Sequence, residues 1–220
     1  MTQDHDISSI LFDANCIVYH CFHTKVRIKI SHSKHINVDL KYPIFTDQIH
    51  EIVNYLCKCC VSIKTIEIVW NEIQKKGLAI IVNEFINSKD FPFNSKYIGN
   101  YEKLNIEKKL QTKLQELSNK PWFKIEPFIA NQDRVDKVIA FYRSLLVTEK
   151  MIQHLSKRNR KYPEPSFEDI NLLIFSKENK LPLLSNDNDF VLFQEEIEEN
   201  NICYRIFPLS EITDPSILTK

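Results

Sequence analysis

Glycine is the residue type that this sequence most clearly lacks. Its 220 residues include only Gly77 and Gly99. Loops that hold nucleotide phosphates need several closely spaced glycines, because side chains would keep the backbone away from the phosphate. The sequence therefore excludes P-loops and dinucleotide-binding turns, and we do not expect ATP or NAD as ligands.

Long apolar runs and a net charge are also absent. No stretch approaches the roughly 18 apolar residues that a membrane-spanning helix needs, and the first residues, MTQDHDISS, are polar and acidic. Lysine and arginine together number 29, as do aspartate and glutamate, so no overall field attracts a polyanion. We expect a cytoplasmic protein with no membrane partner, whose nucleic-acid contacts come from local basic patches.

The six cysteines lack the spacing of a disulfide framework or of a zinc site. Two short groups come nearest to a set of metal ligands, but neither has two well-spaced ligand pairs. These groups are His20, Cys21 and His23, and Cys57, Cys59 and Cys60. We interpret the cysteines as reduced thiols of the core and the histidines as surface residues.

Apolar runs alternate with helical patterns along the chain. The runs predict strands over residues 10–12, 65–70, 122–125, 181–184 and 202–207. Among the helices expected between them, a long one starts near Asp133 and ends in a basic run at residues 157–161, and another begins after Ser166. Parallel strands need helical crossovers, so this alternation predicts one α/β domain with a mainly parallel sheet in a three-layer sandwich.

Residues 24–43 interrupt this alternation. The part from Lys25 to Lys41 is basic, rich in histidine and without clear periodicity. We interpret it as a loop or a hairpin inserted into the domain.

Acidic residues follow three of the predicted strands. Asp13 follows the first strand and Glu72 the second, while Asp187 and Asp189 follow the fourth. Asp169 lies on the helix that leads into the fourth strand. Because open parallel sheets bind their ligands beyond the carboxyl ends of the strands, we expect these side chains to gather at one edge.

Carboxylates crowded together repel one another unless protons or cations lie between them. Oxygen ligands suit hard ions such as Mg²⁺ or Mn²⁺. Water bound to such an ion can attack a phosphodiester, and a second ion can stabilise the leaving oxygen. The acidic pattern therefore predicts a metal-dependent nuclease.

The segments around these acids resemble the PIN-domain ribonucleases. The matching segments are ILFDANCIVYHCF near the start and PSFEDINLLIFSKENKLPLLSNDNDF near the end, and WFKIEPFIANQDRVDKVIAFYRSL is similar to the region before the third family acid. The resemblance implies a Rossmann-like sheet and a divalent metal, held by three or four acids, that cleaves RNA. Many members are toxins of toxin–antitoxin pairs, so an antitoxin-like protein inhibitor and a homodimer are candidate partners.

Position by position, Asp13 resembles the first family acid, Asp169 the third and Asp187 the fourth, so these three are the implied metal ligands. Asn15 is the polar companion of the first acid. Ser185 stands where the family usually has threonine.

The segment also implies a fourth metal ligand. Asp189, with Phe190 after it, matches the D-F pair that is common in the family. The second family acid has two candidates, Glu72 and Glu84, because the family places a glutamate early in the helix after the second strand. We prefer Glu72, which is nearer to the strand end.

The acids other than Asp13 also have a structural interpretation. Asp169 stands three residues after Ser166, as in a capping box at a helix N-terminus. Asp187 and Asp189 can form turns by bonding to the local backbone, and Glu72 can stabilise a helix N-terminus. The nuclease hypothesis therefore depends on the combination of acids.

Basic residues give two candidate contacts with an RNA backbone. One is the insertion, and the other is the run Lys157, Arg158, Arg160 and Lys161. Solvated surface is an equal alternative for both.

Two other functions stay open. A PIN-like fold without catalysis would act as an RNA-binding or protein-docking module. Phosphoryl transfer with Asp13 as nucleophile lacks the second aspartate two residues on, where Asn15 stands. The additional residues between Thr24 and Pro43 are absent from the small toxins and argue against a toxin role.

Overall fold

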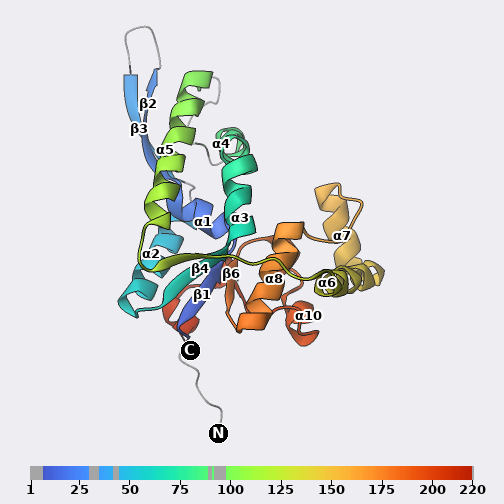
Figure 1. Ribbon diagram of the computed structural model, residues 1–220. Coiled ribbons are helices and arrows are strands. Elements are labelled where there is room, and N and C mark those ends of the chain that lie inside the picture. Colours follow the sequence, from blue (N-terminus) through green and yellow to red (C-terminus); the bar gives the residue numbers. More distant parts are fainter. Residues whose placement is uncertain (1–6, 30–34, 42–44, 89–90, 92–97, 220) are drawn as a thin grey trace.

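Five parallel strands form the centre of the protein in a computed structural model that describes residues 7–29, 35–41, 45–88, 91 and 98–219 (Figure 1). The strands are β1 (Ser9–Phe12), β4 (Ser62–Ile66), β5 (Phe123–Glu126), β6 (Leu183–Ser185) and β7 (Ile206–Pro208). They lie in the order β5-β4-β1-β6-β7. Helices cover both faces, so the predicted three-layer α/β sandwich with a parallel sheet is confirmed.

The helices between the strands form the two outer layers. They are α1 (Ala14–Cys21), α2 (Phe45–Lys58), α3 (Glu67–Glu72), α4 (Leu78–Asn87), α5 (Asn100–Ser118), α6 (Gln132–Ser144), α7 (Glu149–Arg158), α8 (Phe167–Asn179), α9 (Asn188–Val191) and α10 (Gln194–Glu199). A π-helical turn spans Ile73–Gly77, and 3-10 turns span Leu145–Val147, Leu209–Glu211 and Pro215–Thr219. Within the described residues, none of the helices has the length and apolar character that crossing a membrane requires.

Alternating side chains of the central strand divide the core into two halves. Ile10 and Phe12 of β1 belong to the cluster formed with α1, α2, α4 and α5. Leu11 between them belongs to the cluster formed with α6, α7 and α8. A strand covered by helices on both faces is apolar at every position, which explains the uninterrupted run Ile10–Leu11–Phe12 in the sequence.

The order of the strands reverses next to β1. The chain adds β4 and β5 on one side of β1 and later adds β6 and β7 on the other side. Ile10 of β1 pairs with Ile63 of β4, and Phe12 of β1 pairs with Leu184 of β6. The connections after β1 and β6 therefore diverge, and such a switch point is where open parallel sheets bind their ligands.

Three predicted elements are wrong in extent. The last strand, expected over residues 202–207, is limited to Ile206–Pro208. The second strand ends at Ile66, and residues 67–72 form α3 instead of continuing the strand. The long helix that was expected from Asp133 onward is interrupted, because the hydroxyl of Thr148 accepts a hydrogen bond from Met151 N–H and caps a new helix, α7. Leu145 stays buried at the interruption, so the apolar periodicity continues across it.

The inserted segment forms a hairpin, one of the two alternatives that the sequence left open. Its strands, β2 (His23–Lys29) and β3 (His35–Lys41), are antiparallel, and Val26 pairs with Val38. The hairpin extends beside α5 (Figure 1), where the Lys109 ammonium donates a hydrogen bond to the carbonyl oxygen of Lys25.

Truncation of Leu11 tests the central place of β1. Leu11 is fully buried, so Leu11→Ala is expected to lower the free energy of unfolding by about 2–5 kcal/mol, because a cavity remains. Leu104→Ala, at a position of α5 that is 54% exposed, is the matched control and should change it by less than about 0.5 kcal/mol. Chemical denaturation measures both variants, and equal effects would contradict the placement of β1.

Candidate functional site

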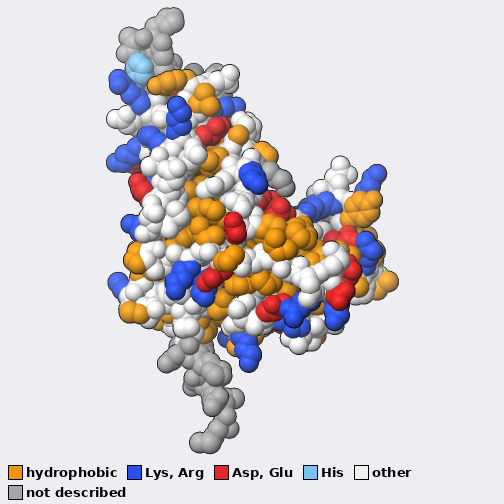
Figure 2. Space-filling model, in the orientation of Figure 1, with side chains coloured by type: hydrophobic (Ala, Val, Ile, Leu, Met, Phe, Trp, Pro, Cys, Tyr) orange, Lys and Arg blue, Asp and Glu red, His pale blue; other side chains and the backbone are white. Residues whose placement is uncertain are grey.

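A cavity of about 330 Å³ lies at the edge of the sheet where β1 and β6 end. Four acidic side chains line it, namely Asp13, Glu72, Asp169 and Asp187, and we call it the acid cavity. Its other lining residues are Ala14, Asn15, Ile73, Ile80, Ile81, Arg160 and Ser166. Figure 2 shows acidic side chains in a hollow between the α4 side and the α7 side of the molecule. The structure therefore brings together the four acids that the sequence proposed as catalytic, with Asn15 beside them.

Asp13 is the most deeply buried of these acids, with 3% of its surface exposed. It caps α1, because its Oδ1 accepts a hydrogen bond from Cys16 N–H at 2.7 Å. Burial raises the pKa of Asp13 to about 6, against the lowering effect of hydrogen bonds from Ser185 and Cys16, and the charge of Asp187 raises it further. The carboxylate is thus fixed in direction and poorly solvated.

Ser185 links the ends of β1 and β6. Its hydroxyl donates to Oδ2 of Asp13 and accepts a hydrogen bond from Asp187 N–H at 3.0 Å. Asp187 in turn caps α9, because its Oδ1 accepts from Asp189 N–H at 2.7 Å. The expected supporting position of Ser185 is therefore next to two of the acids, and Asp187 has the turn-forming role considered as its structural alternative.

Asp169 is both a member of a capping box and a residue of the acid cavity, the two roles that the sequence suggested for it. It forms a capping box with Ser166, whose hydroxyl accepts from Asp169 N–H at 3.1 Å and donates to Asp169 Oδ2 at 2.8 Å. It also lines the acid cavity. Burial raises its pKa to about 7, against the hydrogen bond from Ser166, and the charges of Asp187, Asp13 and Glu72 raise it further.

The structure distinguishes the two candidates for the second acid. Glu72, at the end of α3, lines the acid cavity. Glu84 lies on α4 with an exposed side chain and is not among the residues that line this cavity. Glu72 was expected directly after the second strand. It lies instead at the end of α3, a helix whose first residues were predicted to belong to that strand.

Asp189 lies outside the acid cavity lining, although the sequence placed it among the metal ligands. Its side chain is about 3% exposed, and its Oδ1 lies 2.6 Å from His154 Nε2. Its Oδ2 accepts hydrogen bonds from Arg158 Nη1 at 2.9 Å and from Arg160 Nη1 at 2.6 Å. These contacts make Asp189 the buried centre of an ion network whose arginines are partly exposed, and no feature of the sequence around His154 indicated this.

The basic run that was predicted to contact RNA divides into two kinds of residue. Lys157 and Lys161 are exposed. Arg158 pairs with Asp187 through Nη2, at 3.0 Å, as well as with Asp189, and Arg160 pairs with Asp189 and lines the acid cavity. The two arginines therefore form ion pairs with acidic side chains. The sequence suggested only RNA contact or exposure to solvent for them.

The acid cavity offers a divalent ion the ligands that it prefers. Carboxylates supply oxygen alone, and a bound cation would offset the burial of Asp13 and Asp169 together with their smaller repulsion by neighbouring acids. In the described part of the chain, no three His, Cys, Asp or Glu side chains are close enough to hold a metal ion. The oxygen ligands suit Mg²⁺ or Mn²⁺ in their chemistry, but Asp13, Asp169 and Asp187 would have to draw closer to share one ion.

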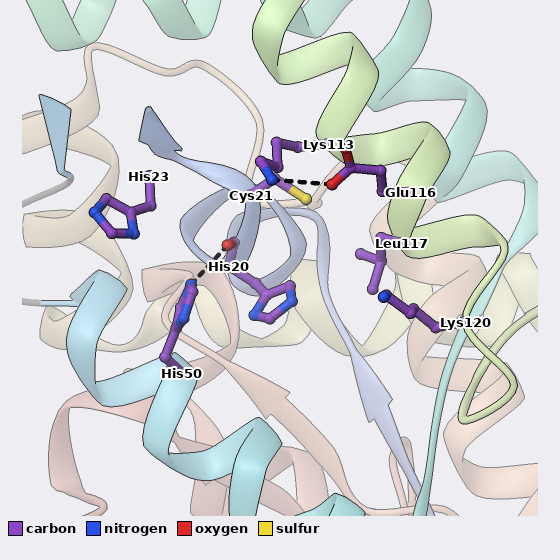
Figure 3. Close-up of a pocket in the computed structure, with 8 residues that line it drawn as sticks. All are labelled: His20, Cys21, His23, His50, Lys113, Glu116, Leu117 and Lys120. Carbon is purple, nitrogen blue, oxygen red and sulfur yellow. Dashed lines mark hydrogen bonds and ion pairs between the residues drawn. The ribbon is translucent and has the colours of Figure 1, made fainter. Parts of the chain in front are cut away.

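A second cavity, of about 250 Å³, lies at the other end of α1 (Figure 3). It is lined by His20, Cys21, His23, His50, Lys113, Glu116, Leu117 and Lys120. Burial lowers the pKa of His20 to about 4, and the nearby His50, Lys113 and Lys120 lower it further. Figure 3 shows Cys21 and His23 pointing in different directions, so the local His20–Cys21–His23 group does not converge on one point.

Comparisons with protein-family models, with curated proteins and with solved structures found no match. The resemblance to the PIN-domain ribonucleases therefore stays a prediction from the sequence, and the site has to be judged on its own geometry.

The raised pKa of Asp13 predicts a pH dependence of stability. Its pKa is about 6 in the folded protein and near 3.8 in the unfolded chain, so the folded state binds the proton more tightly and stability falls as pH rises from about 4 to 7. Asp13→Asn cannot ionise and should remove up to about 3 kcal/mol of this decline, since one pKa unit corresponds to about 1.4 kcal/mol. Asparagine also remains a good helix cap.

Urea denaturation at several pH values measures this effect. Glu211→Gln, at an exposed position, is the control and should leave the decline unchanged. If the stability of the wild type and of Asp13→Asn changed with pH in the same way, the burial of an ionisable Asp13 carboxylate would be contradicted.

Proposed function

We propose that this protein is a divalent-metal-dependent endoribonuclease of the PIN type that hydrolyses phosphodiester bonds of RNA in the cytoplasm. The observation that best supports this proposal is the acid cavity itself. Asp13, Glu72, Asp169 and Asp187 come from four separate parts of the chain and line one cavity at the switch point of a parallel sheet.

Helix caps give the acids their positions in this proposal. Asp13 caps α1, Asp187 caps α9, and Asp169 completes the capping box of α8. A carboxylate bonded to a backbone N–H group has little freedom to rotate, so each of these three acids has a defined direction, although the three must still draw closer to share one ion. The capping bonds of Asp169 with Ser166 fall on Oδ2, and Oδ1 takes no part in them.

A Mg²⁺ or Mn²⁺ ion held by these acids would supply the activated water and stabilise the leaving oxygen. The protein's contribution is the arrangement of Asp13, Asp169 and Asp187, with Glu72 at the end of α3 on the cavity wall. Ile73, Ile80 and Ile81 form an apolar part of that wall. In this proposal the exposed Lys157 and Lys161, which flank the two arginines in the sequence, contact the RNA backbone.

One observation favours the second candidate, a non-catalytic RNA-binding or protein-docking module. The pairing of Arg158 with Asp187, at 3.0 Å, already neutralises an acid that a metal ion would use. If this ion pair persists when metal is present, Asp187 does not bind the metal, and the acid cavity resembles a PIN-type site without cleaving RNA.

Cleavage of labelled RNA separates the two candidates. Single-stranded and structured RNA should be cut by the wild-type protein with Mn²⁺ or Mg²⁺ and not with chelator, and Asp13→Asn and Asp169→Asn should each reduce the rate about 10²- to 10⁴-fold. Mn²⁺ should also raise the melting temperature of the wild type more than that of Asp13→Asn, because ligand binding stabilises the folded state. Absence of both cleavage and this thermal shift would support the non-catalytic module.

Glu72 and Glu84 provide a matched pair of variants. Glu72→Gln should reduce metal-dependent cleavage at least about 100-fold, because Glu72 lines the acid cavity. Glu84→Gln, at an exposed position of α4, should keep the wild-type rate within about twofold. Single-turnover kinetics on one RNA measures both, and equal losses would show that Glu72 has no special place in the reaction.

A further inference from the structure

Arg160 differs in charge from every other residue around the acid cavity. Among the described residues that line this cavity, it is the one with a cationic side chain, alongside four acids. An RNA phosphate that approaches four carboxylates is repelled, and Arg160 is the group placed to offset that repulsion. The question is what keeps a long side chain at this position.

The backbone of Arg160 is fixed by the end of α7. Asn159 adopts the left-handed conformation, with φ of 51°, and ends the helix. The N–H of Arg160 then donates to the carbonyl oxygen of Leu155 at 3.1 Å, the bond that closes a Schellman motif. Arg160 therefore leaves the helix in a defined direction.

The side chain of Arg160 is fixed by Asp189. Their 2.6 Å contact joins Nη1 to a carboxylate that is about 3% exposed, and His154 and Arg158 contact the same carboxylate. Asp189 is itself held in place, because Tyr142 donates from its hydroxyl to the Asp189 carbonyl oxygen at 2.9 Å. The Arg160 side chain is still 37% exposed, so its guanidinium is anchored on one side and accessible on the other.

We propose that Asp189 is a positioning residue, which holds Arg160 at the edge of the acid cavity so that its guanidinium binds a phosphate of the RNA strand. This inference rests on the proposed function, because RNA is the ligand. Asp189 contacts Nη1, so the Nε and Nη2 donors of the guanidinium are outside this ion pair. A planar fork held in advance loses less conformational entropy on binding a phosphate than a free side chain would.

Arg158 completes the arrangement. Its guanidinium bridges two carboxylates, with Nη1 at 2.9 Å from Asp189 and Nη2 at 3.0 Å from Asp187. Arg158 therefore connects Asp189 to Asp187. Because Arg158 pairs with Asp187, the guanidinium of Arg160 is not needed to neutralise that acid. The purely structural alternative is that Asp189 only fastens the end of α7 to α9.

Binding of RNA in chelator tests the proposal without cleavage. The probe is a labelled single-stranded oligoribonucleotide, and fluorescence anisotropy with the full chain gives the affinity. Arg160→Gln and Asp189→Asn should each weaken binding about tenfold, and the double variant should be no weaker, because both changes remove the same contact. Arg160→Gln should also reduce the slope of log affinity against log salt by about 0.7, the loss of one phosphate contact.

Three further variants distinguish positioning from folding. Arg160→Lys keeps the charge but not the fork, so it should keep the salt slope and recover only part of the affinity. His154→Gln removes another partner of Asp189 and should lower the melting temperature while the affinity stays within about twofold. Arg205→Gln, at an exposed position just before β7 and so at the opposite edge of the sheet, is the matched control and should bind RNA like the wild type.

The proposal is wrong if Arg160→Gln binds RNA as Arg205→Gln does, or if Arg160→Lys recovers the full affinity. It is also wrong if Asp189→Asn has a lower melting temperature but unchanged affinity, which would leave Asp189 a structural role alone. Should Asp189→Asn not fold, the comparison of Arg160→Gln, Arg160→Lys and Arg205→Gln decides. Cleavage with Mn²⁺ is measured separately, so Arg160-dependent binding without cleavage rejects the nuclease and keeps this inference.

Discussion

The cost of burying several carboxylates close together is the constraint on which the rest of the site depends, and it comes mainly from lost solvation and to a smaller extent from mutual repulsion. In a parallel sheet each strand is followed by a helix, so the N-termini of these helices gather at the carboxyl edge. Aspartate is a favoured N-terminal cap, and Asp13 and Asp187 both have this role. The topology thus collects acids at one place, and the remaining structure has to tolerate them.

The protein tolerates its acids in two different ways. Asp187 and Asp189 are two residues apart, yet Asp189 is enclosed by His154, Arg158 and Arg160, while Asp187 faces the acid cavity with one arginine contact. Full enclosure by ion pairs offsets the cost of burying the Asp189 charge. Asp13 and Asp169 have no ion pair with a basic residue among the described contacts, and the pKa of each is raised. Ion pairs therefore offset the cost of burial at Asp189, while Asp13 and Asp169 retain that cost in the cavity.

Local patterns in the sequence were enough to predict the parallel sheet and to select the acids that line the acid cavity. The apolar run before Asp13 and the S-x-x-D pattern at Ser166 are short-range features, and the structure has a strand and a capped helix where they occur. The boundary of β4 was missed because the residues after Ile66 suit a strand as well as a buried helix, and tertiary packing made them α3. Glu72 therefore reached the site by a different element from the one expected.

The ion network could not be predicted from local patterns, because its members meet only in the folded chain. His154 lies on α7, 35 residues before Asp189, and a helical histidine beside apolar positions usually indicates core packing. The arginines of the basic run were expected either to contact RNA or to lie in solvent, because the sequence around them does not show that Asp187 and Asp189 lie beside them. The second cavity shows the same limit, since His50 of α2 and Lys113 of α5 join the local His20–Cys21–His23 group only through tertiary structure.

Helix capping alone does not account for the choice of aspartate in the acid cavity. Ser166 caps α8 with a neutral hydroxyl, and Asn131 and Thr148 cap α6 and α7 without any charge, so this fold uses neutral caps where a cap is all that is needed. At Asp13 a buried carboxylate costs stability, since its pKa rises to about 6, and an asparagine there would cap the helix without that cost. Residues that oppose stability in this way are expected at functional sites. If the proposed function holds, the four acids would supply oxygen ligands to a metal ion and Arg160 a guanidinium to a phosphate, which together suit a metal-bound phosphate group.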